Sequence, residues 1–282
     1  MSLKQILTVS FCTLLLSFSV LSALEIKLTA REFEGFTRRG ENVTVGLNLQ
    51  KGTVKNIATL SLLDPAGKAI PAQFETTASW ADGSVRWILI DFIADCAPYG
   101  SAVYTVSDKP AKPGKTTPLK VSRSEETITI ETGVMRCEIN PVHFDLFSRV
   151  WLDHDGDGTF TESELVTTGE SPPSVSATDA AGRKLATGWG EVKSCEIEAE
   201  GPVRATLAVK GSLYESGAVT PGAAKVDYTP RLHFYAGSGL VRVFFTLENH
   251  EPTHPLPDRD GDPSHWVMGR EGAFLFEDMS LN

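Results

Sequence analysis

The chain has 282 residues, of which 41% are hydrophobic, and its 36 acidic against 26 basic side chains give a net charge of −10 at pH 7. An acidic surface repels phosphate backbones and anionic lipids, so we expect no nucleic-acid partner and no peripheral binding to an anionic membrane. The length favours two domains.

The first 23 residues have the pattern of a targeting signal. Lys4 is the one charged residue among them, an apolar run extends from Ile6 to Leu21, and the small residues Ser22 and Ala23 follow it. This order is typical of a cleaved secretory signal peptide. An uncleaved anchor is the alternative, although the run is short for a bilayer span. We therefore expect an extracytoplasmic protein, secreted or periplasmic, with no membrane contact beyond the signal peptide.

Residues 24–107 have the pattern of a small β-barrel. Apolar and polar residues alternate through Val43, Val45 and Leu47, and again from Val85 to Ile90. Such alternation turns one side of a strand towards a core. Turn sequences separate the runs, with Asp-Pro-Ala-Gly at 64–67 and a hairpin-type Asp-Gly at 82–83. Short strands with turns between them predict a barrel or a sandwich.

Residues 108–118 separate this block from a second one. They include three prolines and a glycine without periodicity, which indicates a linker. From 119 to 282 the alternation resumes, for example in Met135–Ile139, Val203–Val209 and Val241–Leu247. Long half-buried strands predict a large antiparallel β-sandwich with one solvated face. The expected fold class is therefore all-β.

Residues 153–164 match a twelve-residue EF-hand-like calcium loop. Ca²⁺ prefers six to eight oxygen ligands, which such a loop supplies from alternating positions around a sharp glycine turn. Gly158 occupies the position of that turn, and Phe160 the apolar position. The predicted ligands are Asp153, Asp155, Asp157, Thr159, Thr161 and Glu164. The alternative is an acidic surface turn that binds nothing.

The setting of this loop indicates a structural task. A predicted strand from Leu146 to Leu152 leads into it, and the exit at 162–166 is too short for more than one helical turn. Calcium sensors respond by opening a pair of helices, and no such pair flanks this loop. We therefore expect the ion to brace a connection of the sandwich.

Three cysteines follow the signal segment: Cys96, Cys137 and Cys195. In an oxidising compartment one pair can form a disulfide and one thiol remains. Cys137 and Cys195 fall on inward positions of two predicted strands, which favours that pair. Three reduced, buried thiols are the equal alternative.

Several segments resemble a known family. Residues 53–74, followed by Trp-Ala-Asp-Gly-Ser-Val-Arg-Trp at 80–87, resemble the N-terminal RIFT barrel of exo-rhamnogalacturonan lyases and their YetA-like relatives. Residues 201–211, 231–237 and 241–249 are similar to the central β-sandwich of the same proteins. The resemblance implies a secreted protein that acts on pectic polysaccharide by β-elimination at a galacturonate.

Family members continue into a large helical toroid domain, whereas this sequence stops at Asn282. The resemblance therefore implies an N-terminal portion with an incomplete catalytic region, and leaves open whether the chain is itself an enzyme. The alternatives are a non-catalytic, calcium-stabilised module that binds carbohydrate, or an adhesin.

A uronate lyase needs a cation for the C6 carboxylate, a base for the C5 proton and an acid for the leaving oxygen. Arg231, His233 and Tyr235 alternate on one predicted strand, so their side chains share a face. These three residues are the catalytic candidates, and an ordinary polar strand face is the alternative.

Overall fold

The computed structural model describes residues 24–114, 119–167, 175–190, 192–215, 226–250 and 274–281. In these ranges the regular structure consists of antiparallel strands and two short 3₁₀ turns, which confirms the all-β class. The expected signal peptide at 1–23 lies outside them, as do residues 115–118 of the expected linker. None of the described helices has the length and hydrophobicity of a membrane span.

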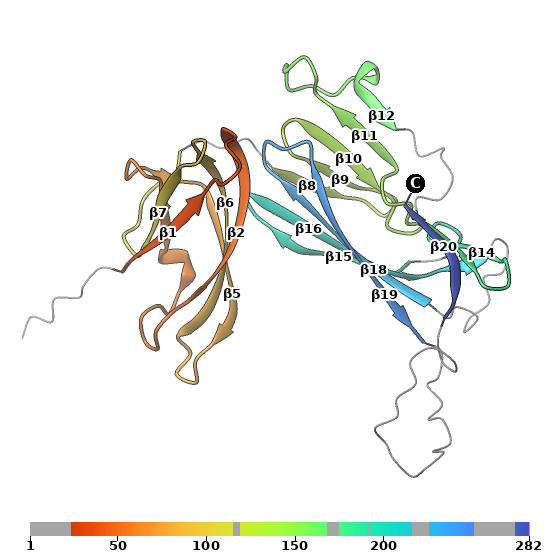
Figure 1. Cartoon of the computed structure of the whole chain (residues 1–282), viewed down its shortest axis with the longest axis horizontal. Helices are drawn as coiled ribbons and strands as arrows, with labels where there is room; N and C mark the ends of the chain where they lie inside the picture. The colour runs from red at the N-terminus through yellow and green to blue at the C-terminus, as the bar shows by residue number, and fades with distance from the viewer. Residues whose placement is uncertain are drawn as a thin grey trace, which may run out of the picture.

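The first domain is the barrel, drawn on the left of Figure 1. Its strands form two sheets, with the orders β1-β7-β3-β4 and β2-β6-β5. They are β1 (Glu25–Arg31), β2 (Arg38–Asn48), β3 (Ser61–Leu63), β4 (Ala69–Ile70), β5 (Ala72–Ser79), β6 (Val85–Cys96) and β7 (Ser101–Ser107), with the 3₁₀ turn η1 (Ile57–Thr59) before β3.

Strand β6 is the centre of the barrel's three-stranded sheet. Ile88, Ile90 and Phe92 alternate along it and are at most 2% exposed, because they point into the barrel core. Trp87 points the other way and is 41% exposed. The Asp-Gly hairpin between β5 and β6 is confirmed, and Gly83 takes the left-handed conformation there, with φ +80°.

The second domain is the sandwich, which has three sheets with the orders β12-β11-β10-β9-β8, β15-β16-β18-β19 and β17-β14-β13-β20. The strands are β8 (Lys120–Arg123), β9 (Ile128–Glu131), β10 (Met135–Ile139), β11 (Arg149–Leu152), β12 (Leu165–Thr167), β13 (Val175–Asp179), β14 (Lys184–Ala186), β15 (Val192–Glu200), β16 (Arg204–Ser212), β17 (Tyr214–Glu215), β18 (Val226–Tyr235), β19 (Val241–Asn249) and β20 (Phe276–Leu281).

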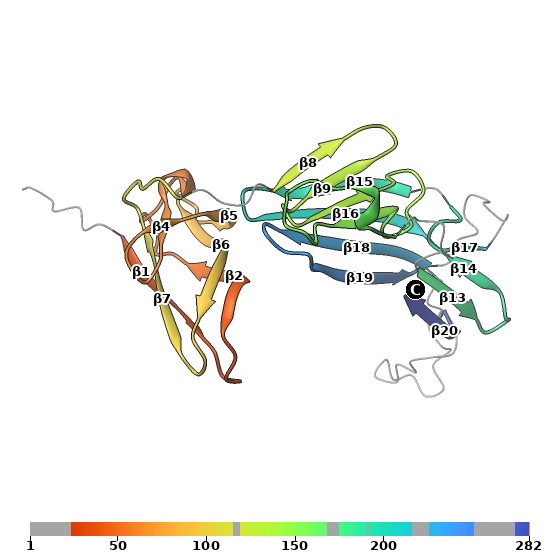
Figure 2. The same ribbon diagram turned by 90° about the horizontal axis from the view of Figure 1, so that it is seen from above.

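The sheet of β8 to β12 packs face to face with the sheet β15-β16-β18-β19 (Figure 2). Ile130 and Cys137 from one sheet share a core with Leu207 and Phe234 from the other, and all four are fully buried. This core is separate from that of the barrel, so each domain buries its own apolar surface.

The strand before the acidic loop is shorter than expected. The sequence predicts it from Leu146, but β11 begins at Arg149. Leu146 has a positive φ of +48° while its side chain remains 5% exposed. The chain therefore turns at this residue to bury a leucine, and only then becomes extended.

Candidate metal site

The acidic loop connects β11 to β12 and contains the second 3₁₀ turn, η2 (Glu162–Glu164). Its first residue is tied to the sheet, because the Asp153 N–H donates to the carbonyl of Val134 across 3.0 Å. The loop therefore lies between strands, in agreement with the sequence interpretation, and no helix longer than one turn flanks it within residues 149–167.

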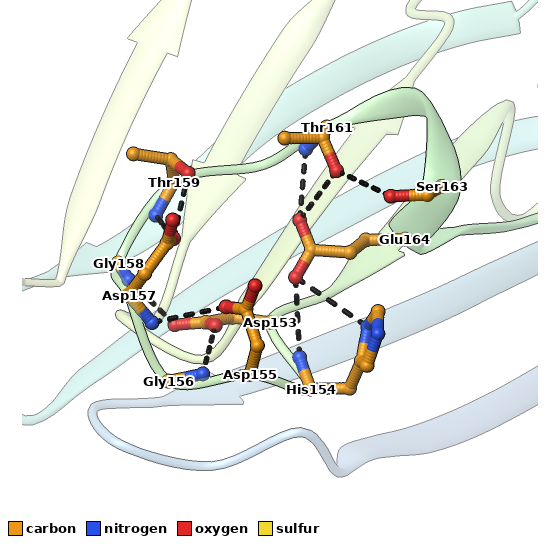
Figure 3. Close-up of polar contacts among 10 residues, drawn as sticks. All are labelled: Asp153, His154, Asp155, Gly156, Asp157, Gly158, Thr159, Thr161, Ser163 and Glu164. Atoms are coloured by element: carbon orange, nitrogen blue, oxygen red, sulfur yellow. Dashed lines mark hydrogen bonds and ion pairs between the residues drawn. The ribbon is translucent and has the colours of Figure 1, made fainter.

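Backbone N–H groups fix the first half of the loop, as Figure 3 shows. The Asp153 carboxylate accepts from Gly156 at 2.7 Å and from Gly158 at 3.0 Å. Both glycines have φ +77°, a conformation that is strained for other residues. Asp155 Oδ1 accepts from the N–H of Asp157 at 3.1 Å. These bonds turn the first two aspartates towards the inside of the loop.

Glu164 closes the loop from the opposite side. Its side chain is only 2% exposed, and its Oε2 accepts from the Thr161 N–H at 2.9 Å and from the Thr161 hydroxyl at 3.0 Å. Oε1 accepts from the His154 N–H at 3.3 Å and lies 3.5 Å from the His154 ring Nδ1 (Figure 3). The sequence interpretation missed His154, because no ligand position of the motif falls on it.

Three of the six predicted ligands converge. Each of Asp153, Asp155 and Glu164 has a carboxylate oxygen within 4.8 Å of the other two. These are hard oxygen donors, the type that Ca²⁺ and Mg²⁺ prefer, and no sulfur or nitrogen ligand from the described part of the chain belongs to the group. The donor set therefore fits a hard divalent cation.

The other predicted ligands are engaged in bonds of their own. Asp157 Oδ1 accepts from the Thr159 hydroxyl at 2.6 Å and from the Thr159 N–H at 2.7 Å, and these bonds lower the pKa of Asp157. The Thr161 hydroxyl lies 2.8 Å from Ser163 Oγ and also bonds Glu164. Asp157 is therefore not among the three carboxylates that converge, and the roles of Thr159 and Thr161 as ligands stay predictions.

Cationic and aromatic side chains hold the loop against its sheet. The Arg136 guanidinium lies 5.5 Å from the centre of the Phe160 ring and 5.8 Å from that of Trp151. Arg149 pairs with Glu162 at 3.0 Å. Phe160, at the apolar position of the motif, therefore anchors the loop through a cation–π contact.

The three catalytic candidates lie on β18, as predicted, but in different surroundings. Arg231 forms a bidentate pair with Glu198, with contacts of 2.8 and 2.9 Å. His233 Nδ1 lies 2.9 Å from the Thr206 hydroxyl, and burial, followed by the nearby Arg204, lowers the pKa of His233. Tyr235 is only 5% exposed. A catalytic role for these residues stays a prediction.

Cys96, Cys137 and Cys195 are all free, so the favoured Cys137–Cys195 disulfide is wrong. The alternative of three reduced, buried thiols is right about their free state, but only Cys137 is buried. Cys137 is fully buried in the sandwich core, whereas Cys195 packs at the edge of that core. Burial raises the pKa of the Cys137 thiol well above its usual range and that of Cys195 to about 11. Both thiols therefore behave as small apolar side chains.

Comparisons with known proteins agree with this architecture. YetA of Bacillus subtilis (strain 168) is 25% identical over 212 residues, which are 72% of this chain and 23% of YetA. An α-mannosidase from Enterococcus faecalis V583 has a TM-score of 0.50 with 12% identity, over 80% of this chain and 30% of the mannosidase, and shares the fold alone. The chain thus spans less than a third of each of these proteins.

Two family models match consecutive segments. Residues 31–103 match the PcRGLX-like N-terminal RIFT barrel domain, and residues 119–254 match the PcRGLX-like protein central β-sandwich domain. The first segment lies within β1 to β7 and the second begins just before β8. Because the two models follow each other in the order of the observed domains, the chain belongs to the PcRGLX-like family, of which it contains the RIFT barrel and the central β-sandwich.

Proposed function

We propose that the chain is a secreted, calcium-stabilised portion of a polysaccharide-active protein of the rhamnogalacturonan-lyase type. The observation that carries this proposal is the match of both domains, in order, to PcRGLX-like models. A protein of that type acts on a pectic glycan by β-elimination. The chain spans 23% of YetA, and the proposal concerns that portion alone.

Calcium is the ion that the acidic loop suits best. The spacing of its carboxylates follows the EF-hand pattern, and three of them already face one another. A bound Ca²⁺ would supply the positive charge that offsets their mutual repulsion. Because the loop joins β11 to β12, the ion would brace one edge of the sandwich.

A non-catalytic, carbohydrate-binding role is the second candidate for this portion. The pairing of Arg231 with Glu198 favours it, because a guanidinium already bound to a carboxylate is a poor receptor for the carboxylate of a uronate. In this case the chain binds the glycan and the eliminating groups come from elsewhere.

The calcium proposal is tested by calorimetry and thermal unfolding. We expect Ca²⁺ to bind and to raise the melting temperature of the sandwich, and Asp155→Asn to remove most of that rise. Asparagine keeps the oxygen that accepts from the Asp157 N–H, so the loop retains its shape and loses a charge. Glu125→Gln, which alters an exposed carboxylate between β8 and β9, is the matched control. Equal melting in calcium and in chelator would exclude the proposal.

The polysaccharide proposal is tested with rhamnogalacturonan oligosaccharides. Binding is measured by calorimetry, and elimination by the ultraviolet absorbance of the unsaturated uronate. We expect binding with little or no unsaturated product. Steady product formation would place the reaction within this chain, whereas no binding to any pectic glycan would contradict both candidate roles.

A further inference from the structure

Two connections at one end of the barrel expose three aromatic side chains to water. The first joins β1 to β2 and contains Phe33 and Phe36, and the second joins β6 to β7 and contains Tyr99. They lie at the same end, because β1 ends beside the start of β7 and β2 starts beside the end of β6. Phe33, Phe36 and Tyr99 are 75%, 59% and 76% exposed, and we call them the aromatic tip. Single exposed rings are common, but three on two adjoining connections indicate a contact surface.

The backbone of Tyr99 has an unfavourable conformation. The Gly100 N–H donates to the Ala97 carbonyl at 2.9 Å, which closes a turn with Pro98 at its second and Tyr99 at its third position. Tyr99 has φ +51°, and a positive φ at this third position normally requires glycine or asparagine. Leu146 has a similar φ but buries its side chain, whereas the exposed ring of Tyr99 gains no such burial. Strain without burial is typical of residues that serve binding.

The side chain of Glu32 fixes the two connections to each other. Its Oε2 accepts from the N–H groups of Gly35 at 2.7 Å and of Tyr99 at 3.0 Å, and its Oε1 accepts from that of Glu34 at 3.0 Å. This carboxylate is only 2% exposed. The ring of Tyr99 lies on Gly35, where a Cβ would come within 2.6 Å of it. The ring is therefore held in place before any ligand arrives, which lowers the cost of ordering it on binding.

Arginines lie on both sides of the aromatic tip. Arg31 ends β1, next to the connection that carries Tyr99, and the guanidinium of Arg38 lies 5.4 Å from the centre of the Phe36 ring. Arg38 is the partner of the three carboxylates of this segment, those of Glu32, Glu34 and Glu41. Arg31 and Arg39 form no ion pair within the described part of the chain. In a protein with a net charge of −10, these two cations favour an anionic partner at this place.

We propose that the aromatic tip is a binding subsite for an acidic glycan, whose sugar rings stack on the aromatic rings and whose uronate carboxylates pair with Arg31 and Arg39. One face of a pyranose consists of C–H groups, which pack on an aromatic ring, while its edge carries hydroxyls and, in a uronate, a carboxylate. The tip offers apolar rings with unpaired guanidinium groups beside them. We rest this inference on the proposed function, which supplies the pectic glycan as the ligand.

Calorimetry of the full chain with rhamnogalacturonan oligosaccharides tests the role of the ring. Tyr99→Asn removes the ring and keeps a residue that accepts the left-handed backbone. We expect the affinity to fall roughly tenfold, as for the loss of one aromatic stacking contact, while the melting temperature does not fall. Leu240→Ala is the matched control, because Leu240 is 78% exposed in the turn between β18 and β19 and should leave both quantities unchanged.

Phe33→Ala is a second variant that does not alter the Tyr99 turn, and it should weaken binding in the same direction. Arg39→Gln should weaken binding of the acidic oligosaccharide and make the affinity less dependent on salt. Circular dichroism verifies that each variant is folded.

The outcomes separate this inference from the function on which it rests. Wild-type affinity in Tyr99→Asn and Phe33→Ala would place the glycan elsewhere on the chain and overturn the subsite, but not the proposed function. Absence of binding of any pectic oligosaccharide by the wild type would overturn both. Binding to anionic phosphatidylglycerol vesicles that is lost in Tyr99→Asn would also overturn the subsite, because the tip would then contact lipid.

Discussion

The acidic loop and the buried ion pair between Asp91 of the barrel and Arg204 of the sandwich are two opposite ways to place carboxylates in a β protein. In the loop, Asp153 and Asp155 are satisfied by N–H groups within five residues of themselves, and most of the loop is exposed. In the ion pair, Asp91 is buried and accepts from the Nε of Arg204, which lies 113 residues away along the chain, across 2.9 Å.

The difference concerns what each carboxylate can still bind. Carboxylates held by local backbone groups keep lone pairs free for an added cation. Asp91 receives a guanidinium and a hydroxyl from the protein itself, so its charge is already compensated. The loop therefore has lone pairs left for an added ion, whereas the Arg204–Asp91 pair depends on the mutual position of the two domains.

The largest expected effect is the loss of the buried pair. Arg204→Met leaves Asp91 buried without its cation, which costs about 3–5 kcal/mol in the free energy of unfolding. Arg231→Met breaks the exposed pair with Glu198, at a cost of roughly 0–1 kcal/mol. Urea titration measures both. Equal losses for the two variants would contradict the distinction between buried and exposed pairs.

The second effect is that of calcium. At a concentration 100 times its dissociation constant, calcium should stabilise the sandwich by about 2.7 kcal/mol and leave the barrel unchanged. Hydrogen exchange of β11 and β12, compared with that of β6, separates the two domains. Because the loop and the Arg204–Asp91 pair share no residue, Arg204→Met should keep this stabilisation. Protection of β6 by calcium would show that the two sites are coupled.

A third carboxylate, that of Glu32 in the barrel, is buried but is held mainly by nearby backbone groups. Burial opposes ionisation of Glu32, but N–H groups of Tyr99, Glu34 and Gly35 and the side chain of Arg38 hold its pKa at about 2. Its contribution to stability is therefore present above pH 4.5 and is lost as the pH falls towards 2. Glu32→Gln should reduce the fall in the melting temperature of the barrel between pH 5 and pH 2, as measured by thermal scans. If the melting temperature fell as steeply in the variant as in the wild type, other groups would control the acid sensitivity of the barrel.

The smallest effect concerns the thiols. With Cys96, Cys137 and Cys195 all free, a reductant should leave the unfolding midpoint of the sandwich unchanged. Because burial raises the pKa of Cys195 to about 11, alkylation at pH 8 should be slower than for a free thiol peptide. Mass spectrometry of the labelled chain measures the rate. A midpoint that falls on reduction would require a disulfide.

Local patterns in the sequence predicted local structure well. Alternation from Val85 to Ile90 predicted a strand with one side on a core, and the structure buries Ile88 and Ile90 on that side. The EF-hand spacing predicted a shared site for Asp153, Asp155 and Glu164, whose carboxylates do converge. These features depend on the pleat of one strand or on a few loop residues, so the chain near each residue is sufficient.

Features that depend on distant contacts were missed. Arg204 and Asp91 each follow a strand pattern, and nothing near either residue indicates its partner. The one sequence signal for this pair is a charged residue within an apolar strand, as at Asp91 between the buried Ile90 and Phe92. The turn at Leu146 was missed for a similar reason, because burial of a leucine outweighs its preference for a negative φ.

One face of strand β6 packs in the barrel core and the other contacts the sandwich, and this limits how the length of the strand can change. Ile90 and Phe92 face the barrel core, while Asp91 between them faces the sandwich. Insertion of one residue before Ile90 would reverse the facing of everything that follows, exposing the core and removing the acid from Arg204 together. Length variation among related proteins should therefore fall in the turns at 80–84 and 97–100, and not within this strand.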